Sequence, residues 1–234
     1  AKKDEYKRLI EEQGNLTPEI SAALDGVSTL TELEDIYRPF RPKRRTRATI
    51  AREKGLAPLA EIIVKQDVFT GSLSELAKPF VKSEKDVNSP EEALAGACDI
   101  IAEDISDNPE YRKTIRQLTF YNGILTSKAS TEDDSVYRLY YDFSEALSKL
   151  PPHRILAINR GEKEGILSVK IDMDENIIYN YLDRKVISKK DSVTSALVKD
   201  AAHDSYKRLI APSVATELRN TVTADAEDAS IKVF

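Results

Sequence analysis

Residues 89–105 read SPEEALAGACDIIAEDI, and this stretch decides the expected fold because it contains the clearest helix start in the chain. Ser89 can cap the helix, Pro90 suits its first turn, and a following glutamate is placed to close a capping box. Behind this start, apolar side chains recur at helical spacing and form one stripe: Leu94, Ala97, Cys98, Ile101 and Ile105. The stretch therefore predicts a helix with one apolar side.

The composition of the whole chain agrees with a helical protein. It has 234 residues, of which 32% are charged and 41% hydrophobic, with eight glycines and no tryptophan. Few glycines and many Glu, Lys, Leu and Ala residues are typical of helical proteins. A chain of this length can form one large domain or two small ones.

Helical patterns with caps, prolines and terminal glycines continue on both sides of the opening stretch. Helices are predicted over residues 3–12, from Pro18, over 28–37, from Thr46 to Gly55, over 56–66, 74–82, 109–122, 153–160 and 191–209, and from Ser213 to the end. A further helix is expected after the aromatic cluster of residues 137–143, and it should end before Pro151.

Short strands interrupt the helices at two places. Residues 124–130 and 166–171 have the composition or alternation of strands, whereas residues 175–187 fit a helix or a strand. The predicted fold is therefore mainly α, with a small β element near 124–130 and 166–171. We expect a helical unit over residues 1–85 and a central helical region over residues 86–234.

Positive charge is concentrated in residues 38–54, RPFRPKRRTRATIAREK, which we call the basic segment. Eight of these 17 residues are Lys or Arg and only Glu53 is acidic, so the segment carries a formal charge of +7 in a chain of −5. Guanidinium and ammonium groups match phosphate oxygens, and the prolines of the segment restrict its backbone. The basic segment is therefore a candidate nucleic-acid contact, formed by Arg41, Lys43, Arg44, Arg45, Arg47, Arg52 and Lys54.

A second interpretation of the basic segment stays open. Its arginines can pair with nearby acids such as Glu32, Glu34 and Asp35, and would then serve packing rather than a ligand. Tyr37 and Phe40 can in principle stack on bases, but burial against a neighbouring helix suits both rings better. Under this interpretation the segment orders neighbouring parts of the protein.

No catalytic or cofactor-binding constellation is recognisable in the sequence. His153 and His203 are the only histidines, and neither has a partner at metal-ligand spacing. Cys98, the single cysteine, lies on the apolar stripe, which favours a buried thiol over a nucleophile. Residues 172–183 resemble the opening of a calcium loop, but Ile177 stands where that loop requires glycine. We therefore expect no enzyme activity, no metal, no cofactor and no small-molecule substrate.

The expected cellular location follows from the cysteine content and from the lack of long apolar runs. A single cysteine fits a reducing compartment, and the apolar runs are far shorter than a membrane span. The first residues lack the apolar core of a signal peptide. We expect a cytoplasmic protein without a membrane partner. Neither end has the features of a natural terminus, so we also expect the sequence to be part of a longer one.

Three blocks of the sequence carry a family resemblance. The first is LEDIYRPFRPKRRT at residues 33–46, and the second is LPPHRILAINRGE at residues 150–162. The third combines ELR at residues 217–219 with AE at 226–227 and IKVF at 231–234. Together these blocks resemble the Tex family of bacterial transcription accessory proteins.

The resemblance implies a mostly helical, N-terminal region of a longer transcription protein, with helix-turn-helix-like packing. In that family an RNase-H-like domain, a helix-hairpin-helix region and an OB-fold RNA-binding domain follow, and this sequence stops before them. A non-enzymatic, nucleic-acid-associated role is implied, with RNA or single-stranded DNA as the ligand and RNA polymerase or other transcription proteins as further partners. The alternative is a protein-interaction or scaffolding region that orders neighbouring domains or contacts RNA polymerase.

Overall fold

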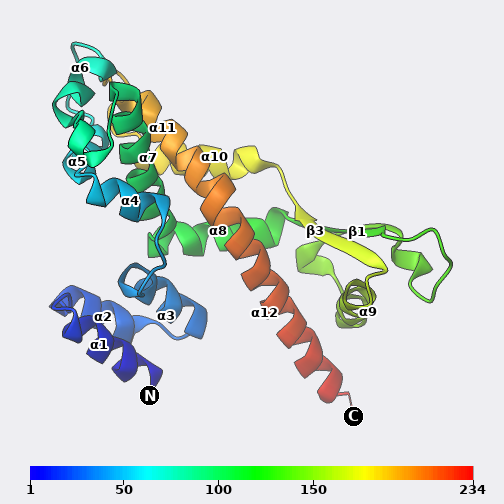
Figure 1. Ribbon diagram of the computed structural model, residues 1–234. Coiled ribbons are helices and arrows are strands. Elements are labelled where there is room, and N and C mark those ends of the chain that lie inside the picture. The colour runs from blue at the N-terminus through cyan, green and yellow to red at the C-terminus, as the bar shows by residue number, and fades with distance from the viewer. Residues whose placement is uncertain (234) are drawn as a thin grey trace. The chain divides into compact units, whose positions relative to one another are not determined.

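The computed structural model describes residues 1–233, and Phe234, the last residue of the third sequence block, lies outside the described residues. The chain divides into two compact units, which we describe separately (Figure 1). Unit 1 comprises Ala1–Lys113 and Tyr179–Ile210, and unit 2 comprises Thr114–Ile178 and the chain from Ala211 onward. The domain boundary expected between residues 85 and 86 does not coincide with this division into units. It stays a prediction.

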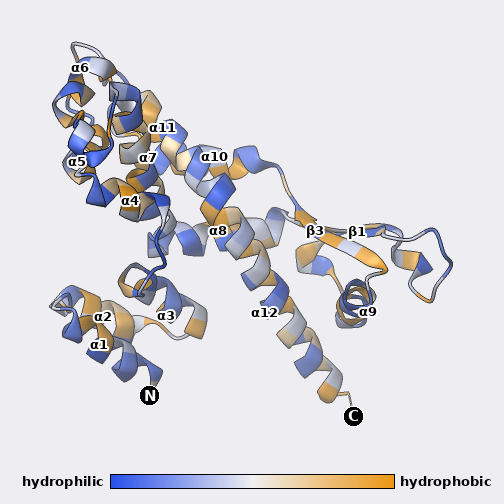
Figure 2. Cartoon of the chain, viewed as in Figure 1, coloured by the Kyte–Doolittle hydropathy of each residue, from blue (hydrophilic) through white to orange (hydrophobic). Residues whose placement is uncertain are grey.

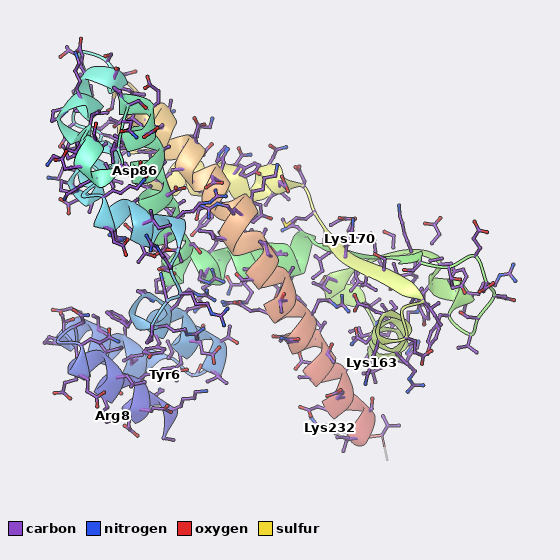
Figure 3. The ribbon with its side chains drawn as sticks, in the orientation of Figure 1. Tyr6, Arg8, Asp86, Lys163, Lys170 and Lys232 are labelled. Carbon is purple, nitrogen blue, oxygen red and sulfur yellow. The ribbon has the colours of Figure 1, made fainter. Side chains whose placement is uncertain are left out.

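Unit 1 begins with a cluster of three helices: α1 (Lys2–Glu12), α2 (Pro18–Gly26) and α3 (Leu30–Tyr37). The hydroxyls of Thr17 and Thr29 cap α2 and α3, each accepting a hydrogen bond of 3.2 Å from a main-chain N–H three residues later. Tyr6, labelled in Figure 3, stacks on Tyr37 with ring centroids 4.1 Å apart. The buried side chains of this cluster are Tyr6, Ile10, Leu24, Leu33 and Tyr37, so the expected burial of Tyr37 is confirmed.

The rest of unit 1 is organised around α7 (Pro90–Ser106), the helix predicted from the opening stretch. Four helices pack on it, as Figure 1 shows: α4 (Arg47–Glu53), α5 (Ala57–Lys65), α6 (Leu73–Ala77) and α11 (Ser195–Asp204). The approach is close at Gly96, where a Cβ atom would overlap Cδ1 of Leu56 and lie 3.4 Å from the Cβ atom of Ala51. Small side chains on α7 therefore allow its neighbours to approach closely.

Two more helices share their residues between the units, because the boundary falls within α8 (Pro109–Asn122) and α10 (Glu175–Val186). Gln66, the left-handed residue that ends α5, connects α5 to the end of α10. Its side-chain amide donates to the carbonyl of Val186 at 2.8 Å and accepts from the N–H of Ser188 at 3.1 Å. These bonds satisfy a buried amide and fix the turn after α10.

Unit 2 contains a three-stranded antiparallel sheet with the order β2-β1-β3. Its strands are β1 (Ile124–Ala129), β2 (Asp142–Ala146) and β3 (Leu167–Asp172). Ser127 in the central strand pairs with Phe143 of β2 and with Val169 of β3. The sheet therefore contains both strands expected from the sequence and one more.

Helices α9 (Pro152–Lys163) and α12 (Ala211–Ile231) complete unit 2. Gly161 lets α9 lie close to β3, because a Cβ atom there would be 2.6 Å from Cδ1 of Leu167. Arg219 of α12 donates to Glu162 at 2.6 Å and to Asn159 at 2.9 Å, which ties the two helices together. Within the described residues, no helix has the length and apolar character needed to cross a membrane.

The mainly α fold with a small β element is confirmed, and two local predictions are corrected. The helix expected before Pro151 is wrong, because residues 142–146 form β2 and pair in register with residues 124–128 of β1. The helix expected over 74–82 is shorter, since α6 ends at Ala77 and Pro79 lies in the 3₁₀ turn that follows. The ambiguous stretch 175–187 is helical, as α10.

A buried ion pair in unit 1 gives a test of the fold. The Arg112 side chain is fully buried, its Nε atom lies 3.6 Å from Oδ1 of Asp35, and it donates to the carbonyl of Ser106 at 3.1 Å. Asp35→Ala leaves this guanidinium group without its carboxylate in the core. We expect the free energy of unfolding to fall by about 3–5 kcal/mol in urea titrations.

The matched control is Glu12→Ala, which removes an exposed carboxylate from its i,i+4 pair with Arg8. Exposed pairs contribute little, so this variant should lose less than about 1 kcal/mol. Equal losses for Asp35→Ala and Glu12→Ala would contradict a structural role of the buried pair.

Candidate nucleic-acid interface

The basic segment connects α3 to α4 and continues to the end of α4. Pro39 lies in a 3₁₀ turn, Arg38–Phe40, after which residues 41–46 run without regular structure, and Figure 2 colours this connector as hydrophilic. Thr46 caps α4, since its hydroxyl accepts the N–H of Thr49 at 3.1 Å. The Thr46 hydroxyl also donates to Glu103 of α7 at 2.8 Å. The connector is therefore anchored to α7 where α4 begins.

Three of the seven candidate contact residues face acids that come later in the chain. Lys43 pairs with Glu103 at 3.2 Å and with Asp107. Arg52 pairs with Asp104 of α7 at 2.8 Å. Lys54 pairs with Asp86, labelled in Figure 3, at 3.3 Å and donates to its main-chain carbonyl at 2.9 Å. These three cations join the basic segment to the rest of unit 1.

The other four candidate residues are exposed, as Lys43 and Arg52 also are, but they differ in having no ion pair with α7 or with Asp86. Arg45 pairs with Glu53 at 3.1 Å, but its side chain is 69% exposed, so the pair is weak and easily exchanged for a ligand. The side chains of Arg41, Arg44 and Arg47 make no hydrogen bond or ion pair with any residue that the structure describes. We call Arg41, Arg44, Arg45 and Arg47 the outward cations.

One acid of α7 lies within electrostatic reach of the outward cations. Burial raises the pKa of Asp99, and the positive charges of Arg208 and Arg47 oppose that rise. Arg208 is the closer partner, at 3.7 Å from Asp99, so Arg47 acts on this carboxylate without an ion-pair contact. Its guanidinium group keeps its donors available for a ligand.

The acids that the sequence suggested as partners each pair with a cation outside the basic segment. Glu32 pairs with Lys113 at 2.7 Å, Glu34 with Lys2 at 4.0 Å and Asp35 with Arg112 at 3.6 Å. Sequence reasoning missed the acids that pair with Lys43, Arg52 and Lys54, which are Asp86, Glu103, Asp104 and Asp107. The only sequence signal for Glu103, Asp104 and Asp107 was the run of acids around the end of the predicted helix over residues 89–105, and Asp86, which precedes that helix, had none.

The residues considered for catalysis are distributed over both units. The imidazole of His203 bonds to Asp183 at 2.7 Å and stacks on Tyr179 with ring centroids 4.2 Å apart. His153 is exposed and belongs to unit 2, whereas Cys98 belongs to unit 1. Within residues 1–233, no group of three or more His, Cys, Asp or Glu side chains is arranged to hold a metal ion.

The fold and the outward cations define the class of protein region: it is mainly helical and has an exposed basic connector between two helices. Comparison with known proteins identifies the family. The Tex central region-like family matches residues 70–234, so the chain belongs to the Tex family.

Relatives of known sequence agree with this assignment. The chain is 41% identical to the uncharacterized protein YdcI of Bacillus subtilis over all of this chain and 33% of that protein. It is 29% identical to the transcriptional accessory protein Tex of Neisseria gonorrhoeae, over 97% of this chain and 30% of that protein. It is 26% identical to the human S1 RNA-binding domain-containing protein 1, over 96% of this chain and 24% of that protein. The chain thus spans about a quarter to a third of the length of these relatives.

The state of the single thiol can be tested chemically. Burial raises the pKa of Cys98 from 9.0 to about 12, with smaller contributions from nearby carboxylates. The thiolate is the reactive form, so its fraction at pH 8 falls steeply on folding. We expect iodoacetamide to alkylate the folded chain at pH 8 at least about ten times more slowly than the chain unfolded in urea.

The control for this measurement carries an exposed thiol in a chain without Cys98, as in Cys98→Ala combined with Lys82→Cys. Lys82 is exposed, so the new thiol should react at nearly the same rate with and without urea. Rapid alkylation of Cys98 in the folded chain would show an accessible thiolate and contradict the raised pKa.

Proposed function

We propose that this chain is a nucleic-acid-associated region of a transcription accessory protein, and that its outward cations contact the phosphates of RNA or single-stranded DNA. The observation that carries the proposal is the exposure of Arg41, Arg44 and Arg47 without an ion-pair partner in the described residues, beside the weakly held Arg45. Guanidinium groups that are already held by carboxylates would have to exchange one anion for another. These groups have all or most of their donors available.

The names of the relatives support the same proposal. One relative is called a transcriptional accessory protein and another an S1 RNA-binding domain-containing protein. Each name describes a protein at least three times as long as this chain, as the 30% and 24% coverage shows. We therefore propose, and do not transfer from the relatives, that this region associates with nucleic acid. The outward cations give the proposal a physical basis.

The remaining parts of the proposal concern chemistry and location. A role without an enzymatic step is supported by the raised pKa of Cys98, which keeps the thiol protonated, and by the engagement of His203 with Asp183. A cytoplasmic location and helix-turn-helix-like packing of the first helices belong to the same proposal. RNA polymerase is proposed as a further partner of the whole protein.

Charge removal at the outward cations tests the proposal. We expect the triple variant Arg41→Gln, Arg44→Gln, Arg47→Gln of this chain to bind a single-stranded 20-nucleotide oligouridylate more weakly in filter-binding titrations at low salt. Each phosphate contact to a single strand contributes a slope of about 0.7 to the dependence of log K on log salt. Loss of three contacts should therefore reduce that slope by about 2.

The matched control is Lys78→Gln, Lys82→Gln, Lys128→Gln, which removes three exposed positive charges elsewhere. Its slope should remain close to that of the unchanged chain. The proposal fails if the chain shows no binding, or if both triple variants lose the same affinity and slope.

A second candidate function has its own support. Lys43, Arg52 and Lys54 are held by acids of unit 1, so this part of the segment fits a scaffolding or protein-interaction role in which it orders neighbouring elements. The two functions predict different results when the acids are neutralised.

The variant Glu103→Gln with Asp107→Asn releases Lys43 from both of its carboxylates. If the segment contacts phosphates, the positive potential around it increases and oligouridylate affinity should rise by about twofold or more. If the segment only orders the packing, affinity should not change, and amide exchange of residues 43–54 should become faster. Measuring both quantities on the same preparation separates the two functions.

A further inference from the structure

A groove in unit 1, apart from the basic segment, lies between α10 and α11 (labelled in Figure 1) and has a volume of about 830 Å³. Its α10 wall uses positions 180, 183 and 184, which share one helix face at spacings of three and four, and Ile187 follows directly after the end of α10. Ala196 and Lys199 belong to the α11 wall, and Lys190 comes from the connection between the helices. This wall spans the eight residues 180–187, or about 10 Å at the rise per residue of a helix.

The charge of this groove is positive. Arg184, Lys190 and Lys199 line it together with one carboxylate, Asp183. Asp183 is already engaged, since its two oxygens lie 2.7 Å from Nε2 of His203 and 3.7 Å from Nζ of Lys199. The side chains of Arg184 and Lys190 are exposed and have no hydrogen bond or ion pair with the residues that the structure describes. An anionic ligand would therefore find two cations available.

The groove is also apolar. Ile187 and Ala196 contribute to its lining, and the methylene stems of Arg184, Lys190 and Lys199 add further apolar surface below their charged ends. No aromatic side chain from the described residues lines it. Proteins that bind single-stranded nucleic acid typically stack bases on aromatic rings, so this groove lacks the feature that would favour a base.

We propose that the α10–α11 groove binds a short acidic segment of a partner protein, with an apolar side chain on Ile187 and Ala196 and carboxylates on Arg184 and Lys190. Bidentate pairing with a guanidinium group and burial of an apolar side chain are the two interactions that such a segment can make here. The length of the wall matches about two helical turns of a partner. The groove is separate from the outward cations, so the proposal does not depend on nucleic-acid binding.

A peptide selection followed by affinity measurements tests the groove. A phage-displayed library of random 12-residue peptides is selected on the purified 234-residue chain, and enriched peptides are titrated by fluorescence anisotropy. We expect enriched sequences that combine Asp or Glu with Leu, Ile, Met or Phe. Their affinity should fall at least tenfold for Arg184→Glu with Lys190→Glu, and equally for Ala196→Trp, which fills the groove from an exposed position.

Lys78→Glu with Lys82→Glu is the matched control, because it makes the same charge change at exposed positions of unit 1 outside the groove. This variant should bind the enriched peptides as the unchanged chain does. Circular dichroism of each variant verifies its helical content before binding is measured.

Three results would overturn the proposal. The first is the absence of any enriched acidic peptide, and the second is enriched peptides whose affinity is the same for the groove variants and the control. The third is a loss of oligouridylate affinity in Arg184→Glu with Lys190→Glu but not in the control, which would assign the groove to nucleic acid. Failure of this test leaves the experiment on Arg41, Arg44 and Arg47 unaffected.

Discussion

The close packing of α4 and the start of α5 on α7 is the constraint on which the organisation of unit 1 depends. Gly96 leaves the space that Leu56 fills, and a larger residue there would overlap it. Around this apolar contact, Arg52 meets Asp104, and the cap residue Thr46 meets Glu103. Close packing at Gly96 and these polar contacts therefore both hold α4 against α7. Together they determine which part of the basic segment lies against the core.

This constraint separates the cations of the segment into two groups. Lys43 is turned toward α7 by its two carboxylates, Glu103 and Asp107. Its neighbour Arg44 is exposed and has no ion pair among the residues that the structure describes. A formal charge of +7 in the sequence thus overstates the charge that is available to a ligand. The packing uses part of it and leaves the outward cations exposed.

Local signals in the sequence predicted most helices, whereas contacts between residues far apart in the sequence could not be predicted from it. The caps at Thr17, Thr46 and Ser89 depend on residues three positions away, so they could be recognised directly. The strand over 142–146 forms because β1 offers it a pairing edge, which a local helical pattern cannot reveal. The partners of the basic segment were missed for the same reason, since Glu103 lies 60 residues from Lys43. The exposure of individual arginines, on which the candidate site rests, follows from such contacts and could not be predicted.

The acidity of the whole chain does not oppose the binding of a polyanion at physiological salt. The chain carries −5, so the residues outside the basic segment carry −12. At about 0.15 M salt, charges farther apart than roughly 8 Å are largely screened, and a phosphate in contact with Arg44 interacts mainly with nearby groups. At low salt the distant acids act over a longer range and partly offset the attraction. The local arrangement of cations, rather than net charge, therefore decides which anions this region can hold, and the same reasoning applies to the groove between α10 and α11.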